Sequence, residues 1–329
     1  MRFALGVDYE LFFGRPTGTV GACMIEPTDA LVSTLERHGA RLTAFVDAAF
    51  LVKVQASKEQ HQAYERVTRQ LRWLVERGHD VQLHVHPHWR NSSWSNGAWR
   101  IDATRYRLQD FEAQDVAAMV AEQTALLTQV TGQAPMAYRA GGWCVQPFDH
   151  IASALRAAGV HVDSTVYLGG LSVNPGREFD FRGAPTADYW RFESDPLRPV
   201  ATGRFLEIPI SPVTVPPTFY WAMAYRKLRP QSAYRSFGDG AALTGSGSYY
   251  LRKLFTFEQG VASIDGARGS LLERALARQK RLGNSILNVM GHPKSISPAS
   301  LERLDEFLRR HDGALEHHTI RSLANVLQT

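Results

Sequence analysis

Cysteine is scarce in this chain. Its 329 residues include two cysteines, Cys23 and Cys144, and no Cys-x-x-Cys pair. Two isolated cysteines cannot build a disulfide framework, and they exclude a cysteine-ligated structural zinc knuckle. The hydrophobic fraction of 44% and the charged fraction of 21% are ordinary for a globular protein. We therefore expect the chain to bury a substantial core without crosslinks.

Long apolar segments are also missing. No apolar run approaches the roughly 20 residues that span a bilayer. The N-terminal segment reaches a charge at Asp8, before it could form the apolar core of a secretory signal. The sequence therefore predicts a cytoplasmic protein.

Signatures of nucleotide and nucleic-acid binding are absent from the sequence. No Gly-x-Gly-x-x-Gly follows the first apolar segment, and there is no Walker loop. The net charge of +5 is only mildly basic, and lysine and arginine are interspersed with acids instead of forming a stripe. We expect no nucleic-acid partner, while a weak attraction to anionic substrates or membrane surfaces stays open.

What the sequence does contain is an alternation of strand-like and helix-like segments. Short apolar runs typical of buried strands lie at 3–7, 42–46, 81–85, 135–138, 160–166, 206–210 and 285–290. Segments with apolar residues at helical spacing lie at 29–38, 59–77, 111–130, 148–158, 270–282, 298–310 and 320–327. The alternation predicts one domain over 1–329, with helices covering a parallel sheet that is doubly wound or closed as a barrel.

The alternation is interrupted between about 167 and 265. Two segments there, 218–228 and 249–257, mix aromatic and basic residues. They predict an aromatic-rich insertion before the last strand. Its aromatic residues would stack on sugar rings or cover the site, pack as a helix on the barrel, or attach to a membrane surface.

Polar side chains follow four of the predicted strands at their carboxyl ends: Asp8, Glu10, His84, His86, His88, Arg139 and His292. In parallel α/β folds the active site lies at that edge. Residues from four strands that are distant in sequence are therefore expected to form one site.

The three histidines favour a metal site. His84 and His88 are four residues apart across a turn, whereas His84 and His86 share one face of a strand, so the two pairs are rivals. One carboxylate of the pair Asp8 and Glu10 would complete a two-histidine, one-carboxylate site, and the other would take a proton from water.

Several of these blocks resemble, in the same order, the motifs of the polysaccharide deacetylase (NodB-homology) family, also called carbohydrate esterase family 4. Gly6-Val-Asp-Tyr-Glu10 is similar to the first motif, which ordinarily has adjacent aspartates. His84 and His88 match the metal-binding His-x-x-x-His motif, and 138–143 resembles the third motif, which contains Arg139. The segments 206–210 and 291–294 resemble the strand and the late histidine motif that follow.

The resemblance implies a distorted (β/α) barrel with fewer than eight strands. It implies that Asp8 is the general base, that Arg139 orients it and that His292 is the general acid. It implies a divalent metal, zinc first and cobalt, iron, nickel or manganese as alternatives, held by Glu10, His84 and His88. Because Glu10 replaces the usual aspartate, Asp8 stays an alternative ligand, and the extra His86 leaves the second histidine open.

The implied activity is N-deacetylation of an N-acetylated sugar through a metal-bound water, in surface polysaccharide or O-antigen biosynthesis. The substrate would be nucleotide- or lipid-linked, and a lipid-linked one would place the protein at the inner membrane face. A deformylase of a lipid-linked amino sugar and a metal-retaining carbohydrate-binding protein without turnover are the alternatives.

Four further residues are candidate substrate contacts. Trp143 would wall the acyl pocket, unless it belongs to the core. Asp163 would pair with His292 or serve a turn. Lys294 would touch an anionic substrate, or lie exposed in a loop, and Trp221 would stack on a sugar.

Overall fold

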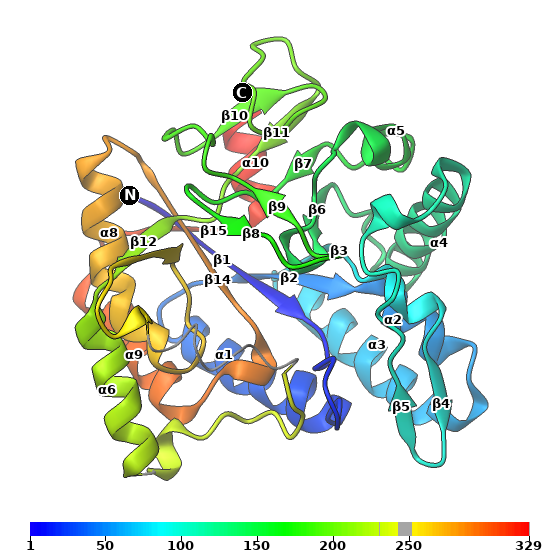
Figure 1. Cartoon of the computed structure of the whole chain (residues 1–329), viewed down its shortest axis with the longest axis horizontal. Coiled ribbons are helices and arrows are strands. Elements are labelled where there is room, and N and C mark those ends of the chain that lie inside the picture. The colour runs from blue at the N-terminus through cyan, green and yellow to red at the C-terminus, as the bar shows by residue number, and fades with distance from the viewer. Residues whose placement is uncertain (230, 243–251, 329) are drawn as a thin grey trace.

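The centre of the fold is a parallel sheet. The computed structural model describes every residue except 230, 243–251 and 329 (Figure 1). Within the described residues, seven parallel strands lie in the spatial order β11-β7-β6-β3-β2-β1-β14. Their bounds are Arg2–Tyr9 for β1, Leu42–Asp47 for β2, Asp80–Val85 for β3, Ala137–Ala140 for β6, Val162–Asp163 for β7, Phe205–Glu207 for β11 and Ile286–Gly291 for β14. β10 (Trp190–Phe192) joins β11 in antiparallel fashion, and β15 (Glu316–His318) pairs with β1 in parallel.

The sheet curls until its two ends meet. The backbone N–H of Ser211, just after β11, donates to the carbonyl of Asn288 on β14 at 2.9 Å. The side-chain amide of Asn288 in turn donates to the carbonyl of Ile208 and the hydroxyl of Ser164, each at 3.1 Å. The fold is therefore a distorted barrel of parallel strands, which confirms the predicted fold class.

Each helix that the sequence predicted is present. The helices are α1 (Glu26–Glu36), α3 (His61–Glu76), α4 (Ala113–Thr131), α5 (Asp149–Ala157), α8 (Leu272–Arg281), α9 (Pro298–Arg310) and α10 (Ile320–Gln328). Gly132 ends α4 in the left-handed conformation, with φ of 72°, which is the stop that glycine favours. No helix in the described ranges is both long and apolar enough to cross a membrane.

The sequence did not predict the helix that follows β2. α2 (Ala48–Gln55) follows β2 directly and is capped by Asp47, whose carboxylate accepts from the backbone N–H of Phe50 at 3.5 Å. A helix that begins without a break at the end of a strand leaves no turn residues for a sequence pattern to detect.

The interval between β7 and β14 has a different character. It contains the hairpin β8 (Leu171–Ser172) and β9 (Phe179–Asp180), the pair β12 (Pro212–Val215) and β13 (Glu258–Val261), and helix α6 (Pro217–Leu228). The aromatic segment 218–228 is thus almost all of α6. The second aromatic segment begins with 249–251, which lie outside the described residues. A further hairpin, β4 (Ser93–Ser95) and β5 (Ala98–Arg100), follows β3.

Strand register places the polar residues side by side. β1 and β14 pair with Val7 opposite Gly291, so Asp8 and His292 emerge together at the end of that pair. In the neighbouring pair of strands, His84 on β3 lies opposite Arg139 on β6. The carboxyl edge therefore gathers the residues that the sequence singled out.

Candidate active site

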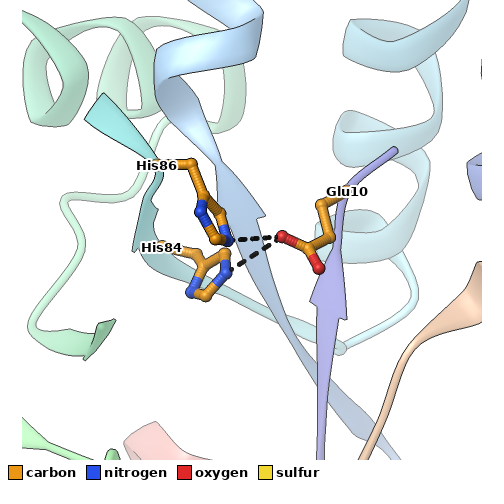
Figure 2. A group of neighbouring side chains, drawn as sticks. All are labelled: Glu10, His84 and His86. Atoms are coloured by element: carbon orange, nitrogen blue, oxygen red, sulfur yellow. Dashed lines mark hydrogen bonds and ion pairs between the residues drawn. The ribbon is translucent and has the colours of Figure 1, made fainter. Parts of the chain in front are cut away.

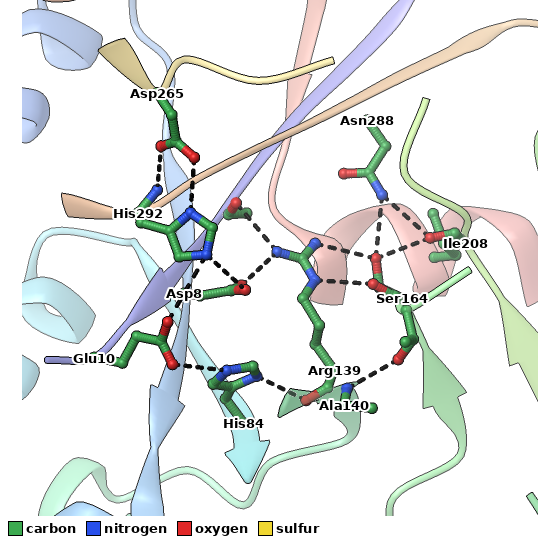
Figure 3. A network of polar contacts seen from close by, with 12 residues as sticks. Asp8, Glu10, His84, Arg139, Ala140, Ser164, Ile208, Asp265, Asn288 and His292 are labelled. Atoms are coloured by element: carbon green, nitrogen blue, oxygen red, sulfur yellow. Dashed lines mark hydrogen bonds and ion pairs between the residues drawn. The ribbon is translucent and has the colours of Figure 1, made fainter. Parts of the chain in front are cut away.

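A pocket of about 300 Å³ opens at the carboxyl ends of β1, β3 and β14. Six of its polar lining residues lie at or just after the ends of these three strands: Asp8, Glu10, His84, His86, His292 and Lys294. Figure 3 shows most of these side chains directed toward a common centre. A larger pocket of about 730 Å³ lies beside β8 and β9, but none of these six residues lines it.

Three side chains converge on one point of this pocket. One oxygen of Glu10, Oε2, lies 3.2 Å from Nε2 of His84 and 2.7 Å from Nε2 of His86 (Figure 2). All three residues are buried, and one ligand atom from each lies within 4.8 Å of the others. Two imidazoles and a carboxylate form a donor set that suits several transition metals.

His84 is held in the tautomer that a ligand needs. Its Nδ1–H donates to the carbonyl of Arg139 at 2.8 Å, so that Nε2, which lies 3.2 Å from Oε2 of Glu10, is the nitrogen left to face a ligand site. A second hydrogen bond of this kind is how proteins orient metal-binding histidines. Burial lowers the pKa of His86 to about 4, so that this ring is neutral at neutral pH, which is the form that binds metals.

The structure brings together His84 and His86, not His84 and His88. The three ligand atoms that converge belong to Glu10, His84 and His86, whereas the sequence predicted Glu10, His84 and His88 and left His86 as the rival of His88. His84 and His86 share a face because side chains alternate along an extended strand. The turn after His86 carries His88 into an aromatic layer, where its ring stacks on Tyr106 with centroids 5.5 Å apart and planes at 5°. Within the described residues, neither ring nitrogen of His88 has a hydrogen-bond partner.

Arg139 is fully buried and directed at Asp8. Its Nη1 donates to Oδ1 of Asp8 at 2.8 Å, and its Nε donates to the carbonyl of Ser164 at 2.8 Å. The guanidinium lies over the ring of Phe45, with its central carbon 4.0 Å from the centroid. A Cβ on Gly6 would lie only 2.9 Å from both of these groups, so a larger residue there would displace one of them. These contacts fix the position of the arginine.

Asp8 is ionised despite its burial. Burial alone would raise its pKa, but the positive charge of Arg139, assisted by His84 and His292, outweighs this effect and lowers the pKa. Its second oxygen, Oδ2, lies 3.6 Å from Nε2 of His292. Asp8 therefore presents one tethered oxygen to Arg139 and a second oxygen to His292.

His292 is held by Asp265, a residue that the sequence did not single out. The carboxylate of Asp265 accepts from the Nδ1–H of His292 and from its backbone N–H, both at 2.7 Å. Burial lowers the pKa of His292, but the negative charge of Asp265, followed by those of Asp8 and Glu10, raises it to about 9. His292 is therefore protonated at neutral pH, with Nε2 directed toward the two acids.

Replacing Asp265 with asparagine should change the pH dependence of activity. If protonated His292 is required, activity falls as the pH rises through its pKa. Without the negative charge the pKa of His292 is lower, so we expect the alkaline limb of kcat/KM to move to lower pH. A pH–rate profile of Asp265→Asn beside the parent protein measures this, and an unmoved alkaline limb would contradict the role of His292.

Asp163 does not pair with His292, which was one of the two roles that the sequence left open for it. It is buried behind the site, where Oδ1 accepts from the hydroxyl of Thr165 at 2.7 Å. It also faces Glu207, and burial raises the pKa of both carboxyls. The partner of His292 is Asp265, so the pairing of His292 with Asp163 was wrong.

Lys294 is buried, not exposed in a loop. Its Nζ donates to Oε1 of Glu10 at 2.8 Å and to the carbonyl of Leu11 at 2.7 Å. Burial would raise the pKa of Glu10, but the charge of Lys294, together with the hydrogen bonds of His84 and His86, lowers it well below its usual value. Glu10 is therefore anionic, with Oε1 bound to lysine and Oε2 facing the histidines.

The two candidate tryptophans differ in position. Trp143 lines the pocket, and its ring also contacts Tyr167 with centroids 5.5 Å apart. Trp221 lies on α6, is 52% exposed and is not among the residues that line this pocket. The structure thus places Trp143, but not Trp221, beside the cluster.

Asp47 is a second residue that was missed. It ends β2, is fully buried, and accepts from the indole Nε1–H of Trp89 at 2.6 Å and from the backbone N–H of His86 at 3.4 Å. Burial, followed by the charge of Glu10, raises its pKa to about 7. Asp47 holds the turn that carries the histidines. As a polar residue at a strand end, it carried the same signal as the others.

The fold is shared with solved structures at low sequence identity. A protein described as a polysaccharide deacetylase from Mycobacterium smegmatis is 14% identical and gives a TM-score of 0.50, over 99% of this chain and 90% of its own. Puue allantoinase is 14% identical with a TM-score of 0.51, over 98% and 89%. A GH57-type branching enzyme from the hyperthermophilic archaeon Pyrococcus horikoshii is 9% identical with a TM-score of 0.53, over 98% and 70%. No protein-family model and no curated protein matches the sequence.

These likenesses confirm the predicted resemblance to polysaccharide deacetylases at the level of the fold. The three neighbours have different names, and one fold commonly supports several chemistries. The function of this chain must therefore be argued from its site.

Proposed function

We propose that this protein is a metal-dependent N-deacetylase of an N-acetylated sugar. The observation that carries the proposal is the arrangement of one pocket. An ionised carboxylate and a protonated histidine face each other there, beside a carboxylate and two histidines that suit a metal. A base, an acid and a metal together are suited to hydrolysis of an unactivated amide by water.

The metal would be held by Glu10, His84 and His86, with zinc as the first choice among divalent ions. The hydrogen bond that fixes the tautomer of His84 and the neutral ring of His86 support this set. Asp8 is less suited as a ligand, because Arg139 already engages it. A divalent ion bound there would act as a Lewis acid toward the acyl carbonyl and lower the pKa of a water.

Asp8 would act as the general base. Arg139 holds Oδ1, so Oδ2 is the oxygen that remains to accept a proton as water attacks the acyl carbon. The ion pair also prevents Asp8 from rotating, which keeps the base in one orientation.

His292 would act as the general acid. As the carbon–nitrogen bond breaks, its Nε2–H would protonate the leaving nitrogen, giving a free amine and acetic acid, which releases its own proton to solvent to become acetate. Asp265 stabilises the protonated ring before this transfer. Asp8 gains one proton and His292 loses one, and transfer between them, or by way of solvent, restores the starting state.

The substrate would be a sugar that carries an anionic group, such as the diphosphate of a nucleotide- or lipid-linked precursor in surface polysaccharide or O-antigen biosynthesis. Arg177, between β8 and β9, lines the pocket with its guanidinium 4.5 Å from the ring centroid of Tyr106. In the described parts of the chain no carboxylate pairs with Arg177, so its charge is available to a substrate. Lys294, the lysine of the pocket lining named above, already forms an ion pair with Glu10. Guanidinium groups bind phosphate with two parallel hydrogen bonds.

Arg177→Gln should therefore raise KM for a phosphate-linked substrate by about 10- to 100-fold, the cost of losing a hydrogen bond to a charged group. A neutral N-acetylated oligosaccharide should be affected far less. The matched control is Arg182→Gln, which removes an arginine that pairs with Asp180 outside this pocket. Equal losses on both substrates would contradict the role of Arg177.

The proposed function is tested by incubating metal-loaded protein with nucleotide-linked, lipid-linked and oligomeric N-acylated sugars and identifying the acid that is released. We expect acetate. Formate would select a deformylase. Tight glycan binding without any released acid would instead identify the protein as a carbohydrate-binding protein without turnover.

A further inference from the structure

A group of exposed apolar side chains takes no part in the proposed hydrolysis. They lie on α6 and on the segment 254–257, and we call them the aromatic patch: Trp221 (52% exposed), Tyr225 (56%), Leu228 (82%), Phe255 (74%) and Phe257 (69%). Single exposed apolar residues are ordinary, but a contiguous group of large ones marks a surface that binds something.

The two parts of the aromatic patch are joined by direct contacts. The indole Nε1–H of Trp221 donates to the carbonyl of Leu254 at 2.9 Å. The rings of Trp221 and Phe255 pack edge to face, with centroids 6.1 Å apart and planes at 88°. Trp221, Tyr225 and Leu228 are spaced by four and three residues, which places them on one face of the helix.

The patch is accompanied by positive charge. Residues 217–258 include six lysines and arginines but only two acids. Both acids are engaged, since Asp239 accepts from Thr19 and Glu258 pairs with Lys253. The guanidinium of Arg226 lies over the ring of Tyr234 and that of Arg229 near the ring of Tyr225, at 4.3 and 5.5 Å from the centroids. Within the described ranges neither arginine pairs with a carboxylate. The surface therefore combines aromatic side chains with unneutralised cations.

The chain that leaves α6 reaches the candidate active site. The backbone N–H of Phe237 donates to the carbonyl of Ile296 at 2.9 Å, and that of Ala241 to the carbonyl of Pro16 at 2.7 Å. Ala242, the next residue, lines the pocket. Figure 1 shows this coil running from α6 toward the ends of β1 and β14. The aromatic patch and one wall of the pocket thus belong to the same insertion.

We propose that the aromatic patch docks on a membrane surface that contains anionic lipid. Aromatic side chains favour the boundary between headgroups and acyl chains, and arginines next to them neutralise lipid phosphates. The excess of cations is what favours a lipid surface over a second copy of this chain, whose matching patch would carry the same charge. The proposal goes beyond the hydrolysis and does not depend on it, because it concerns residues outside the pocket.

Flotation of the full chain with vesicles tests this docking. We expect binding to vesicles of phosphatidylcholine with phosphatidylglycerol, weaker binding to phosphatidylcholine alone, and a decrease as salt is raised. The triple variant Trp221→Ser, Phe255→Ser and Phe257→Ser should lower the partition coefficient by about 100-fold or more, since each large apolar side chain contributes roughly a tenfold factor.

Two comparisons keep the test specific. Val173→Ser removes an exposed apolar side chain elsewhere, 76% exposed, and should leave vesicle binding unchanged. Arg226→Gln with Arg229→Gln should weaken binding to the anionic vesicles only. Failure to bind either vesicle, or equal binding by the triple variant, would overturn the proposal. A dimer that the triple variant abolishes, without vesicle binding, would assign the patch to a second copy.

Discussion

Asp8→Asn is expected to lower kcat for acetate release by about 10²- to 10⁴-fold, the usual contribution of a positioned general base. An amide has no basic oxygen to accept the proton from water. Its carbonyl can still accept the hydrogen bond from Arg139 that Oδ1 of Asp8 accepts at 2.8 Å. The substitution therefore removes the base while leaving a partner for the buried guanidinium, which Asp8→Ala would not do.

The measurement is kcat under saturating substrate, with metal content and melting temperature determined on the same sample. Because Asp8 is proposed not to bind the metal, Asp8→Asn should retain it. A kcat close to that of the parent protein would exclude Asp8 as the base. Loss of the metal together with activity would instead identify Asp8 as a ligand and exchange its role with Glu10.

His86→Ala and His88→Met are expected to differ sharply in metal binding. His86 supplies one of three converging ligand atoms. Removing a residue that only hydrogen-bonds to a metal ligand typically weakens metal binding by about 10- to 100-fold. Loss of the ligand His86 itself should therefore weaken zinc binding by at least about 100-fold. His88 lies in the neighbouring aromatic layer, where its ring contacts that of His86, but it does not supply one of the converging atoms. Replacing it with an apolar side chain of similar size should leave zinc affinity nearly unchanged.

The His88 substitution also reports on stability. In the described residues, both of its ring nitrogens lie buried without a partner, and burying such groups costs free energy. We therefore expect His88→Met to melt no lower than the parent protein. Titration calorimetry with zinc separates the two histidines, and loss of zinc by His88→Met with retention by His86→Ala would restore the His-x-x-x-His pairing.

Much of the site could be predicted because parallel strands end at a common edge. This rule and the motif resemblance found Asp8, Glu10, His84, Arg139 and His292. Four of these five residues line one pocket, and Arg139 lies just behind Asp8, to which it donates a hydrogen bond. Asp47 obeys the same rule and could have been found in the same way.

The choice between His86 and His88 could not be made from spacing alone. It depends on where β3 ends, since an extended backbone pairs His84 with His86 whereas an earlier turn would have paired it with His88.

Asp265 could not be predicted from the sequence for a different reason. It follows β13, after an insertion that interrupts the regular alternation, and no local pattern shows that this loop returns to His292.

The close approach of the loop after β6 to the end of β3 could not be predicted from the sequence either. A Cβ on Gly141 would lie 2.5 Å from the carbonyl oxygen of Val85 and 2.7 Å from the ring of His86. Glycine at this position lets the loop after β6 pass next to His86, one of the proposed metal ligands. Such a requirement arises only once β3 and β6 are neighbours.

Acetate release during metal titration tests the proposed function most directly. The protein is stripped with a chelator, freed of the chelator, and supplied with increasing zinc in the presence of an N-acetylated, phosphate-linked sugar. We expect no release from the stripped protein and a rise that reaches its plateau at one equivalent of zinc. Release that is unaffected by stripping, or that is absent at every zinc concentration, would contradict a metal-dependent deacetylase at this site.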